Sequence, residues 1–164
     1  MMRNGIELYL VRHAIAAERG TAWPDDRLRP LTRHGIERFT QVVRGLTKLD
    51  IKVEVVYTSP LTRARQTAEL LAEGLAEPPL LKVMRALEPG AAPEDVVAAL
   101  RTRSRRVALV GHEPDLGRLA AFLIGASTPL AFKKGGVCRI DLTVPVRKGH
   151  GSLVWFAPPR FLRR

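Results

Sequence analysis

The chain has 164 residues, of which 46% are hydrophobic and 26% charged, so it fits one compact domain over residues 1–164 and is not intrinsically disordered. Its apolar stretches fall far short of the roughly 18 to 20 residues that span a bilayer, and its N-terminal run is too short and too charged for a signal peptide, so we expect a cytoplasmic protein. The single cysteine, Cys138, excludes an internal disulfide and a multi-cysteine metal site, while the formal net charge of +11 needs an explanation.

The first half of the chain alternates strand-like and helical patterns. Residues 6–11 predict a strand, and residues 32–49 predict an amphipathic helix with Thr32 as its N-cap. Apolar residues recur there at three- and four-residue spacing and predict the buried face: Ile36, Phe39, Val42, Val43 and Leu46. Residues 53–59 predict a second strand, and Ser59 and Pro60 predict the cap and first position of the next helix.

The second half continues the alternation. Residues 77–93 are loop-like and contain at most a short strand. Further helices are expected at 94–103 and at 114–125, the latter ending at Gly125. Strand patterns occupy 105–112, 137–144 and 151–157, and the last two form a strand pair around a turn. Strands alternating with helices predict an α/β layer structure with a mostly parallel sheet.

Ligands of open α/β sheets bind beyond the carboxyl ends of the strands, which provides a test for polar residues. Arg12 and His13 follow the first strand, Arg63 lies in the helical turn after the second, and His112 follows a later strand. We therefore expect these side chains to meet at one edge of the sheet. The second Arg-His pair, at 33–34, opens a helix with no strand before it and is expected on the surface.

This set of side chains suits phosphoryl chemistry. Two guanidiniums match phosphoryl oxygens, and an imidazole among them is a candidate nucleophile or general acid. No carboxylate pair accompanies the set, so we expect a phosphoryl anion as ligand, with no metal and no cofactor. A zinc site of His13, His112 and one carboxylate is a weaker alternative, because the neighbouring arginines would repel the metal.

Four segments together resemble the histidine phosphatase superfamily, within it the small SixA-type phosphohistidine phosphatases. They are "LYLVRHAIA", "RPLTRHG", "VYTSPLTRARQTAELL" and "VALVGHEPDLGRLAAFL", in family order and spacing. The resemblance implies a phosphoglycerate mutase-like fold, a three-layer sandwich whose mostly parallel sheet of about six strands has helices on both faces. It also implies that His13 is the nucleophile, that Arg12 and Arg63 bind the phosphoryl group, and that His112 is the second histidine of the pocket. Arg29, and Ser59 beside the pocket, are further candidate substrate-binding residues.

The chain departs from the family pattern at two points. Ala14 stands where the superfamily usually has glycine after the Arg-His pair, so we expect ordinary backbone angles there. The chain also lacks room for the inserted segment that carries an acid in larger members, and Glu88 is the nearest candidate for a general acid. Because imidazole leaves more readily than an alkoxide, a pocket without a strong acid favours an N-phosphorylated substrate. His112 then either protonates the leaving group or only binds an oxygen.

The sequence therefore predicts a metal-independent phosphatase that forms a phosphohistidine intermediate and acts on a phosphohistidine-carrying protein. A phosphatase for a sugar phosphate or nucleotide, and a non-enzymatic nucleic-acid-binding protein, are the alternatives. The charge of +11 fits a surface for nucleic acid, a cleft that attracts phosphorylated substrates, or solvated arginines. Dense basic clusters occur only at 101–106 and 160–164, so solvated arginines are the default, and we do not expect nucleic acid or membrane as partners. The sequence does not indicate an oligomeric state.

Overall fold

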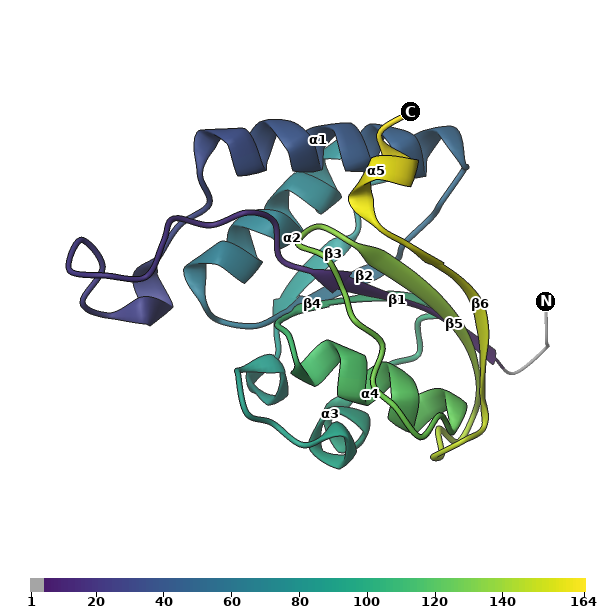
Figure 1. The fold of residues 1–164 in the computed structure, drawn as a ribbon. Coiled ribbons are helices and arrows are strands. Elements are labelled where there is room, and N and C mark those ends of the chain that lie inside the picture. The colour runs from purple at the N-terminus through teal and green to yellow at the C-terminus, as the bar shows by residue number, and fades with distance from the viewer. Residues whose placement is uncertain (1–4) are drawn as a thin grey trace.

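A computed structural model describes residues 5–164 and contains a six-stranded sheet between two layers of helices (Figure 1). The strands lie in the order β3-β2-β4-β1-β5-β6. Their bounds are β1 Gly5–Arg12, β2 Val55–Thr58, β3 Leu80–Val83, β4 Arg106–Gly111, β5 Val137–Thr143 and β6 Gly151–Ala157. The helices are α1 Arg33–Lys48, α2 Thr62–Gly74, α3 Pro93–Ala99, α4 Asp115–Ile124 and α5 Pro159–Leu162, with short 3-10 turns η1 Asp26–Leu28 and η2 Arg85–Leu87.

The four strands β1 to β4 run parallel, and β5 pairs antiparallel with β1. β6 returns antiparallel along β5 as the predicted strand pair. In the central pair, Arg12 of β1 is in register with Gly111 of β4, so the two strands end at the same level. The three-layer fold with a mostly parallel sheet, predicted from the sequence, is thereby confirmed.

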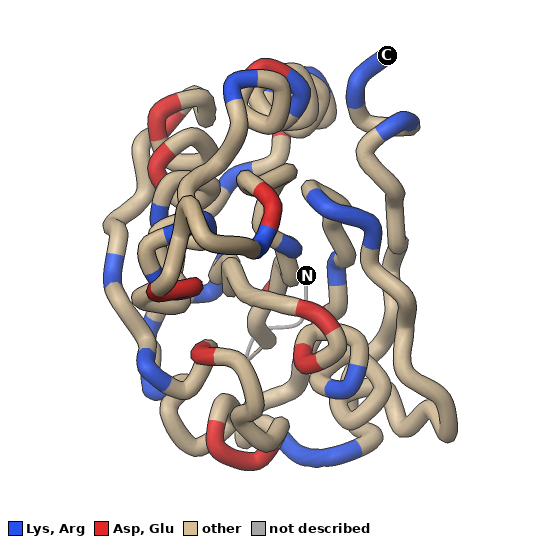
Figure 2. Tube along the Cα trace, turned by 60° about the vertical axis from the view of Figure 1, so that its left-hand side comes forward, with Lys and Arg blue, Asp and Glu red and all other residues tan. Residues whose placement is uncertain are grey.

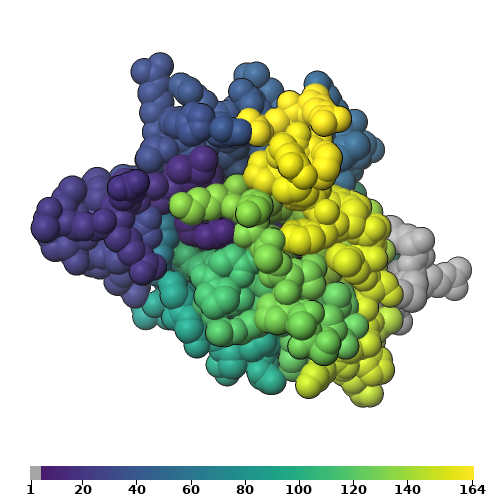
Figure 3. All heavy atoms as spheres, viewed as in Figure 1, coloured from purple at the N-terminus to yellow at the C-terminus, as the bar shows by residue number. Residues whose placement is uncertain are grey.

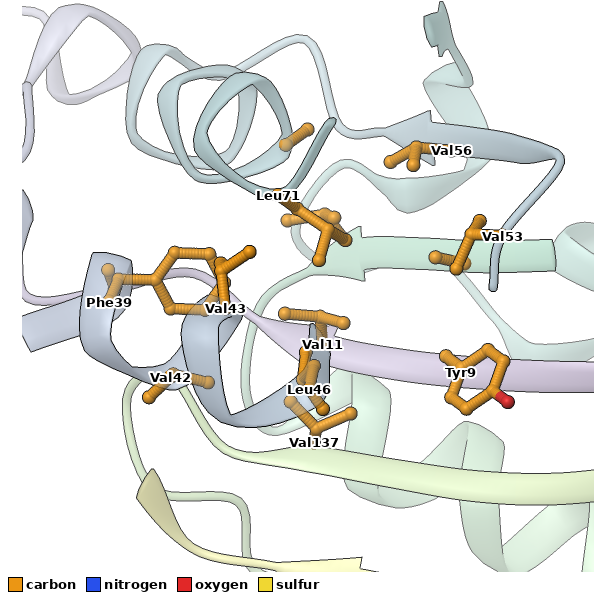
Figure 4. Packing of buried hydrophobic residues seen from close by; sticks show 14 of the residues in the cluster. Tyr9, Val11, Phe39, Val42, Val43, Leu46, Val53, Val56, Leu71 and Val137 are labelled. Carbon is orange, nitrogen blue, oxygen red and sulfur yellow. The ribbon is translucent and has the colours of Figure 1, made fainter. Parts of the chain in front are cut away.

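One face of the sheet is covered by α1, α2 and α5 (Figure 1). Side chains from α1 and α2 pack there on β1 and β2, as Figure 4 shows for Phe39, Leu46 and Leu71. Thr32 caps α1 as predicted, since its hydroxyl accepts from the amide of Gly35 at 2.9 Å. The expected apolar face is correct except for Ile36, which is 38% exposed because it lies at the edge of the buried stripe.

The opposite face is covered by α3 and α4 (Figure 1), which pack on a second apolar cluster. α4 ends at Gly125 as predicted, with a left-handed φ of 75° that glycine adopts at little cost. α3 ends at Ala99 instead of continuing to 103, and 80–83 forms the exposed edge strand β3.

The predicted start of α2 was wrong. The helix begins at Thr62, and neither Ser59 nor Pro60 takes the expected cap position. The Ser59 hydroxyl instead forms hydrogen bonds with Nε2 of His112 and the amide of Leu61, so it does not cap the first turn of α2.

Candidate active site

His13 and His112 lie side by side at the ends of the two central strands. The amide of His13 donates to the carbonyl of Gly111 at 3.0 Å, which continues the pairing of β1 and β4 by one residue. The centroids of the two imidazole rings are 5.2 Å apart. The sheet therefore sets the spacing of the two rings.

His13 is held as a neutral imidazole with a defined orientation. The residue is 6% exposed, and this burial lowers its pKa to about 3. A hydrogen bond to Ala14 acts in the opposite direction, while the charges of Arg63, Arg12 and Lys134 lower the pKa further. Nδ1 lies 2.7 Å from the carbonyl oxygen of Ala14, to which it donates. The tautomer that this bond selects leaves the lone pair of Nε2 free for attack.

His112 is oriented by Ser59. Its Nε2 lies 2.8 Å from the Ser59 hydroxyl, which also accepts from the amide of Leu61 at 3.3 Å. A hydroxyl oxygen accepts up to two hydrogen bonds, so the bond from Leu61 leaves both directions open; if the hydroxyl donates to Nε2, the proton of the neutral ring lies on Nδ1. Burial, followed by the charges of His13 and Arg63, lowers the pKa of His112 to about 3. Nδ1 is buried and has no hydrogen-bond partner.

Arg63, at the start of α2, is held by Asp26 of η1. Its Nη1 donates to the main-chain oxygen of Asp26 at 2.9 Å, and its Nη2 lies 3.1 Å from the Asp26 carboxylate. Burial lowers the pKa of Arg63, while Asp26 acts in the opposite direction. With both terminal nitrogens bound to Asp26, the Nε of Arg63 is left buried without a partner.

Arg12 completes the group of four residues that sequence reasoning expected to meet. Its Nη1 donates to the carbonyl of Phe132 at 2.7 Å, and its Nε is buried without a partner. Residues 5–164 contain four buried side-chain nitrogen or oxygen atoms without a partner, and three of them belong to this group: Arg12 Nε, Arg63 Nε and His112 Nδ1. Such orphaned donors are costly unless a ligand accepts from them, so the group is suited to bind an anion with several oxygens.

Arg29 and Glu88, the two candidates drawn from loops, are both bound to other side chains or to the main chain. Arg29 is 7% exposed and donates from Nε to Asp26 at 2.9 Å and from Nη1 to the carbonyl of Ala17 at 2.6 Å. Glu88 accepts from Arg27 at 2.8 Å and lines a small cavity together with His112. Arg29 thus supports Asp26, and Glu88 is tied to η1.

Asp26 was not singled out from the sequence. Burial acts to raise the pKa of Asp26, but the hydrogen bond from Arg29 and the charges of Arg63 and Arg29 outweigh it and lower this pKa, so Asp26 is a carboxylate. The spacing of Asp26 and Arg29, three residues apart in "DDRLRP", is the signal that could have found this ion pair.

The residues around the Arg-His pairs have the expected backbone. Asp50 is the only non-glycine residue with positive φ within 5–164, so Ala14 has ordinary angles, and its amide donates to Thr67 at 3.0 Å. Arg33 and His34 are exposed on the first turn of α1, as predicted. Gly35 beside them has a packing role, because a Cβ there would lie 2.0 Å from the carbonyl oxygen of Ile15.

Two further observations concern the whole described region. Residues 5–164 hold no group of three or more histidine, cysteine or acidic residues placed to bind a metal ion. They also include no helix that is both long and apolar enough to cross a membrane.

Comparison with known proteins identifies the family. Residues 8–87 match the model of the histidine phosphatase superfamily, branch 1. An uncharacterized protein of Picosynechococcus sp. is 38% identical over 138 residues, which cover 80% of this chain and 82% of that protein. The phosphohistidine phosphatase SixA of Escherichia coli is 27% identical over 158 residues, which cover 94% of both chains.

Solved structures agree with this assignment. The protein histidine phosphatase SixA complexed with tungstate superposes with a TM-score of 0.84 at 27% identity, over 96% of this chain and 99% of that one. A putative alpha-ribazole-5'-P phosphatase from Escherichia coli shares the fold, with a TM-score of 0.73 at 18% identity over 95% and 98% of the two chains. The chain therefore belongs to the histidine phosphatase superfamily, resembles its SixA type, and is a phosphatase.

Proposed function

We propose that the protein is a protein phosphohistidine phosphatase in which His13 carries the phosphoryl group between two transfer steps. The observation that carries this proposal is the set of three buried N–H donors without partners, on Arg12, Arg63 and His112. With the proton of neutral His112 on Nδ1, these three atoms offer donors for the oxygens of a phosphoryl group bound to His13. The positive charge of the two guanidiniums takes the place of a metal ion in neutralising these oxygens.

In the first step, Nε2 of neutral His13 attacks phosphorus in line with the leaving nitrogen. A new P–N bond forms to His13 while the P–N bond of the substrate breaks, and the leaving imidazole takes a proton from water; the hydroxide formed is neutralised by the proton that the second step releases. The low pKa of His13 keeps its lone pair available at neutral pH. His112 donates from Nδ1 to a phosphoryl oxygen. Because its pKa is lowered to about 3, the ring is neutral and serves as a hydrogen-bond donor and not as an acid.

In the second step, water attacks the phosphorus of phosphorylated His13. The P–N bond breaks, inorganic phosphate leaves, and His13 returns to the neutral form. Arg12, Arg63 and His112 hold the same oxygens in both steps, so one pocket serves both transfers.

The choice of an N-phosphorylated substrate is supported by the contacts of the carboxyl groups near the pocket. Glu113, next to His112, accepts from the amide of Phe132 at 2.7 Å, although burial raises its pKa. Asp26 is an ionised carboxylate bound to Arg63, and Glu88 is bound to Arg27. An alkoxide leaving group would need a strong acid at this place, whereas imidazole needs much less help. The pocket as built therefore favours phosphohistidine over an alkyl phosphate.

Radiolabel trapping tests the mechanism. Wild-type protein incubated with a ³²P-labelled phosphohistidine carrier protein and quenched is expected to carry acid-labile label, whereas His13→Ala carries none and loses hydrolysis. His34→Ala, the histidine of the exposed Arg-His pair, is the matched control and is expected to behave like the wild type. Retained hydrolysis in His13→Ala would exclude the proposed nucleophile.

A substrate panel tests the specificity. We expect kcat/KM for the phosphohistidine protein to exceed that for a simple alkyl phosphate, a sugar phosphate and a nucleotide. Equal or better turnover of any of these esters would assign the enzyme to small-molecule phosphatases.

A further inference from the structure

A basic groove borders the active site on the α1 side of the sheet. It encloses a cavity of about 570 Å³ between the end of β1, the first half of α1, the turn 133–135 and the C-terminal segment 158–163. Figure 3 shows blue α1, the green segment before β5 and the yellow C-terminal segment meeting on one face. None of the four residues expected to form the active site lies in it except Arg12.

The groove gathers cations that have no carboxylate partner. Its lining includes six of them: Arg12, Arg38, Lys133, Lys134, Arg160 and Arg163. Within residues 5–164 none of the six takes part in an ion pair, although ten ion pairs are present elsewhere. Figure 2 shows basic positions in the segment that leads to the C-terminus and around the rest of the trace. In the groove, six basic side chains thus lie together without an ion pair.

The floor of the groove is apolar. Its accessible part is formed by Ile15, Pro158 and Pro159, with the buried residues Ala14, Phe39 and Val42 beneath. The Nε of Arg163 is buried without a partner, and it is the fourth such atom in the described residues. A ligand that fills this groove must therefore combine apolar surface with acceptors for basic side chains.

The groove is continuous with the active site. Arg12 belongs to both, and the amide of Gly135 donates to the carbonyls of Arg12 and His13 at 3.1 and 3.2 Å. This turn fixes the exposed Lys133 and Lys134 next to the strand end that carries His13. A phosphoprotein with its phosphohistidine over His13 thus brings neighbouring surface onto the groove.

We propose that the basic groove binds an acidic, partly apolar segment of the phosphoprotein substrate and thereby selects phosphoproteins by the charge around their phosphohistidine. This inference rests on the proposed function, because it needs a protein substrate. Opposite charges at the rim steer association and fix the register of the two surfaces.

The composition of the groove favours a protein segment over other anions. A second phosphate of a small substrate would use the cations but would leave the accessible apolar part of the lining, Ile15 and the two prolines, uncovered. Single-stranded nucleic acid binds by stacking its bases on exposed aromatic rings, and Phe39, the one aromatic residue of the lining, is 1% exposed. Acidic side chains interspersed with apolar ones match both the rim and the floor.

Charge reversal at the rim tests the inference. The variant Arg38→Glu/Arg160→Glu changes one cation on α1 and one on α5, and the control Arg44→Glu/Arg147→Glu changes the net charge equally at exposed positions outside the groove. The substrates are a phosphohistidine carrier protein with an acidic surface and free phosphohistidine. For the protein substrate we expect KM to rise about tenfold in the groove variant with kcat unchanged, and to change less than about threefold in the control. Hydrolysis of free phosphohistidine should remain within about twofold of the wild type in both, because the exchanged residues lie outside the group that binds the phosphoryl oxygens.

The possible results distinguish docking in the groove from the alternatives. Equal rises of KM in the groove variant and the control would show that the effect comes from overall charge. An unchanged KM in the groove variant would exclude docking in the groove. Either result leaves the proposed function intact. If the wild type does not hydrolyse the phosphohistidine carrier protein, both proposals are overturned together. Tight binding of a single-stranded oligonucleotide that only the groove variant loses, with KM for the phosphoprotein unchanged, would assign the groove to nucleic acid instead. If the groove variant does not fold, Arg38→Gln/Arg160→Gln gives the same test with a smaller expected rise.

Discussion

Asp26 binds both terminal nitrogens of Arg63, one through its carboxylate at 3.1 Å and one through its main-chain oxygen at 2.9 Å. Each terminal nitrogen keeps a second N–H, and Nε has no partner, so these donors remain for a ligand while Asp26 acts as a positioning residue for the guanidinium. We expect Asp26→Ala to lower kcat/KM for phosphohistidine about tenfold, because a charge-assisted bond that orients Arg63 is lost. Asp26→Asn, which keeps an acceptor, should lose less. Steady-state hydrolysis measures both, and a gain in kcat/KM for Asp26→Ala would contradict the positioning role.

Arg29 gives a second test of the same arrangement, because its Nε holds the Asp26 carboxylate. If Arg29 acts only through Asp26, Arg29→Ala costs no more than Asp26→Ala, and the double variant is no worse than Asp26→Ala alone. If Arg29 binds the phosphoryl group directly, as the resemblance of its motif suggests, the two losses multiply. A double-mutant cycle on kcat/KM separates the two roles.

Ser59 is expected to contribute through the tautomer of His112. Ser59→Ala removes the hydroxyl that lies 2.8 Å from Nε2, and with it the donor that we propose holds the ring proton on Nδ1. We predict a fall in kcat of about three- to tenfold with little loss of thermal stability. An unchanged kcat together with an unchanged ¹⁵N spectrum of His112 would show that the hydroxyl does not select the tautomer.

The low pKa values of the two site histidines lead to a prediction about stability at acidic pH. Burial lowers the pKa of both His13 and His112 to about 3, against 6.5 for an ordinary imidazole. Their ¹⁵N signals, assigned with His13→Ala and His112→Ala, should stay those of neutral rings down to about pH 4. Between about pH 3 and 6.5 the unfolded chain binds more protons than the folded one, so each ring lowers the free energy of unfolding as the pH falls through this window. Denaturant titrations at pH 7, 5 and 4 measure the slope, and protonated signals above pH 5 would refute it.

Gly35 reverses the usual preference for alanine in helices. A Cβ at this position would lie 2.0 Å from the carbonyl oxygen of Ile15, which also accepts from the amide of Thr32. We therefore expect Gly35→Ala to lower the free energy of unfolding by about 1 to 3 kcal/mol, although the same exchange stabilises an unobstructed helix. Gln41→Ala, at an exposed position of α1, is the control and should change it little. Midpoints of denaturant unfolding give both values.

Much of the architecture could be read from the sequence, because strand and helix periods differ and glycine and threonine mark helix ends. Thr32 and Gly125 were placed correctly for this reason. The failures occur where a tertiary contact outweighs a local rule. Ser59 followed by Pro60 is a good helix start, but His112, which is 53 residues away, takes the hydroxyl. Ile36 fits the helical period and still lies at the edge of the buried stripe.

The site was predictable only in the part that strands deliver. Arg12, His13 and His112 stand at strand ends and Arg63 in the helical turn after β2, so a rule about parallel sheets places them together. Asp26 lies in the 3-10 turn η1, and its bond to Arg63 depends on how this turn packs against α2. The basic groove was equally hidden, because its cations come from four separate segments of the chain and no sequence window contains them.

The pairing of Arg12 with Gly111 has an evolutionary consequence. The distance between the two imidazoles follows from the spacing of about 4.8 Å between adjacent strands, which no substitution in a loop can change. Asp26, Glu88 and the groove residues 133–135 and 158–163, by contrast, belong to turns and terminal segments. Descendants of such a chain can exchange these segments and acquire new substrates while the rings that handle phosphorus stay at the same separation.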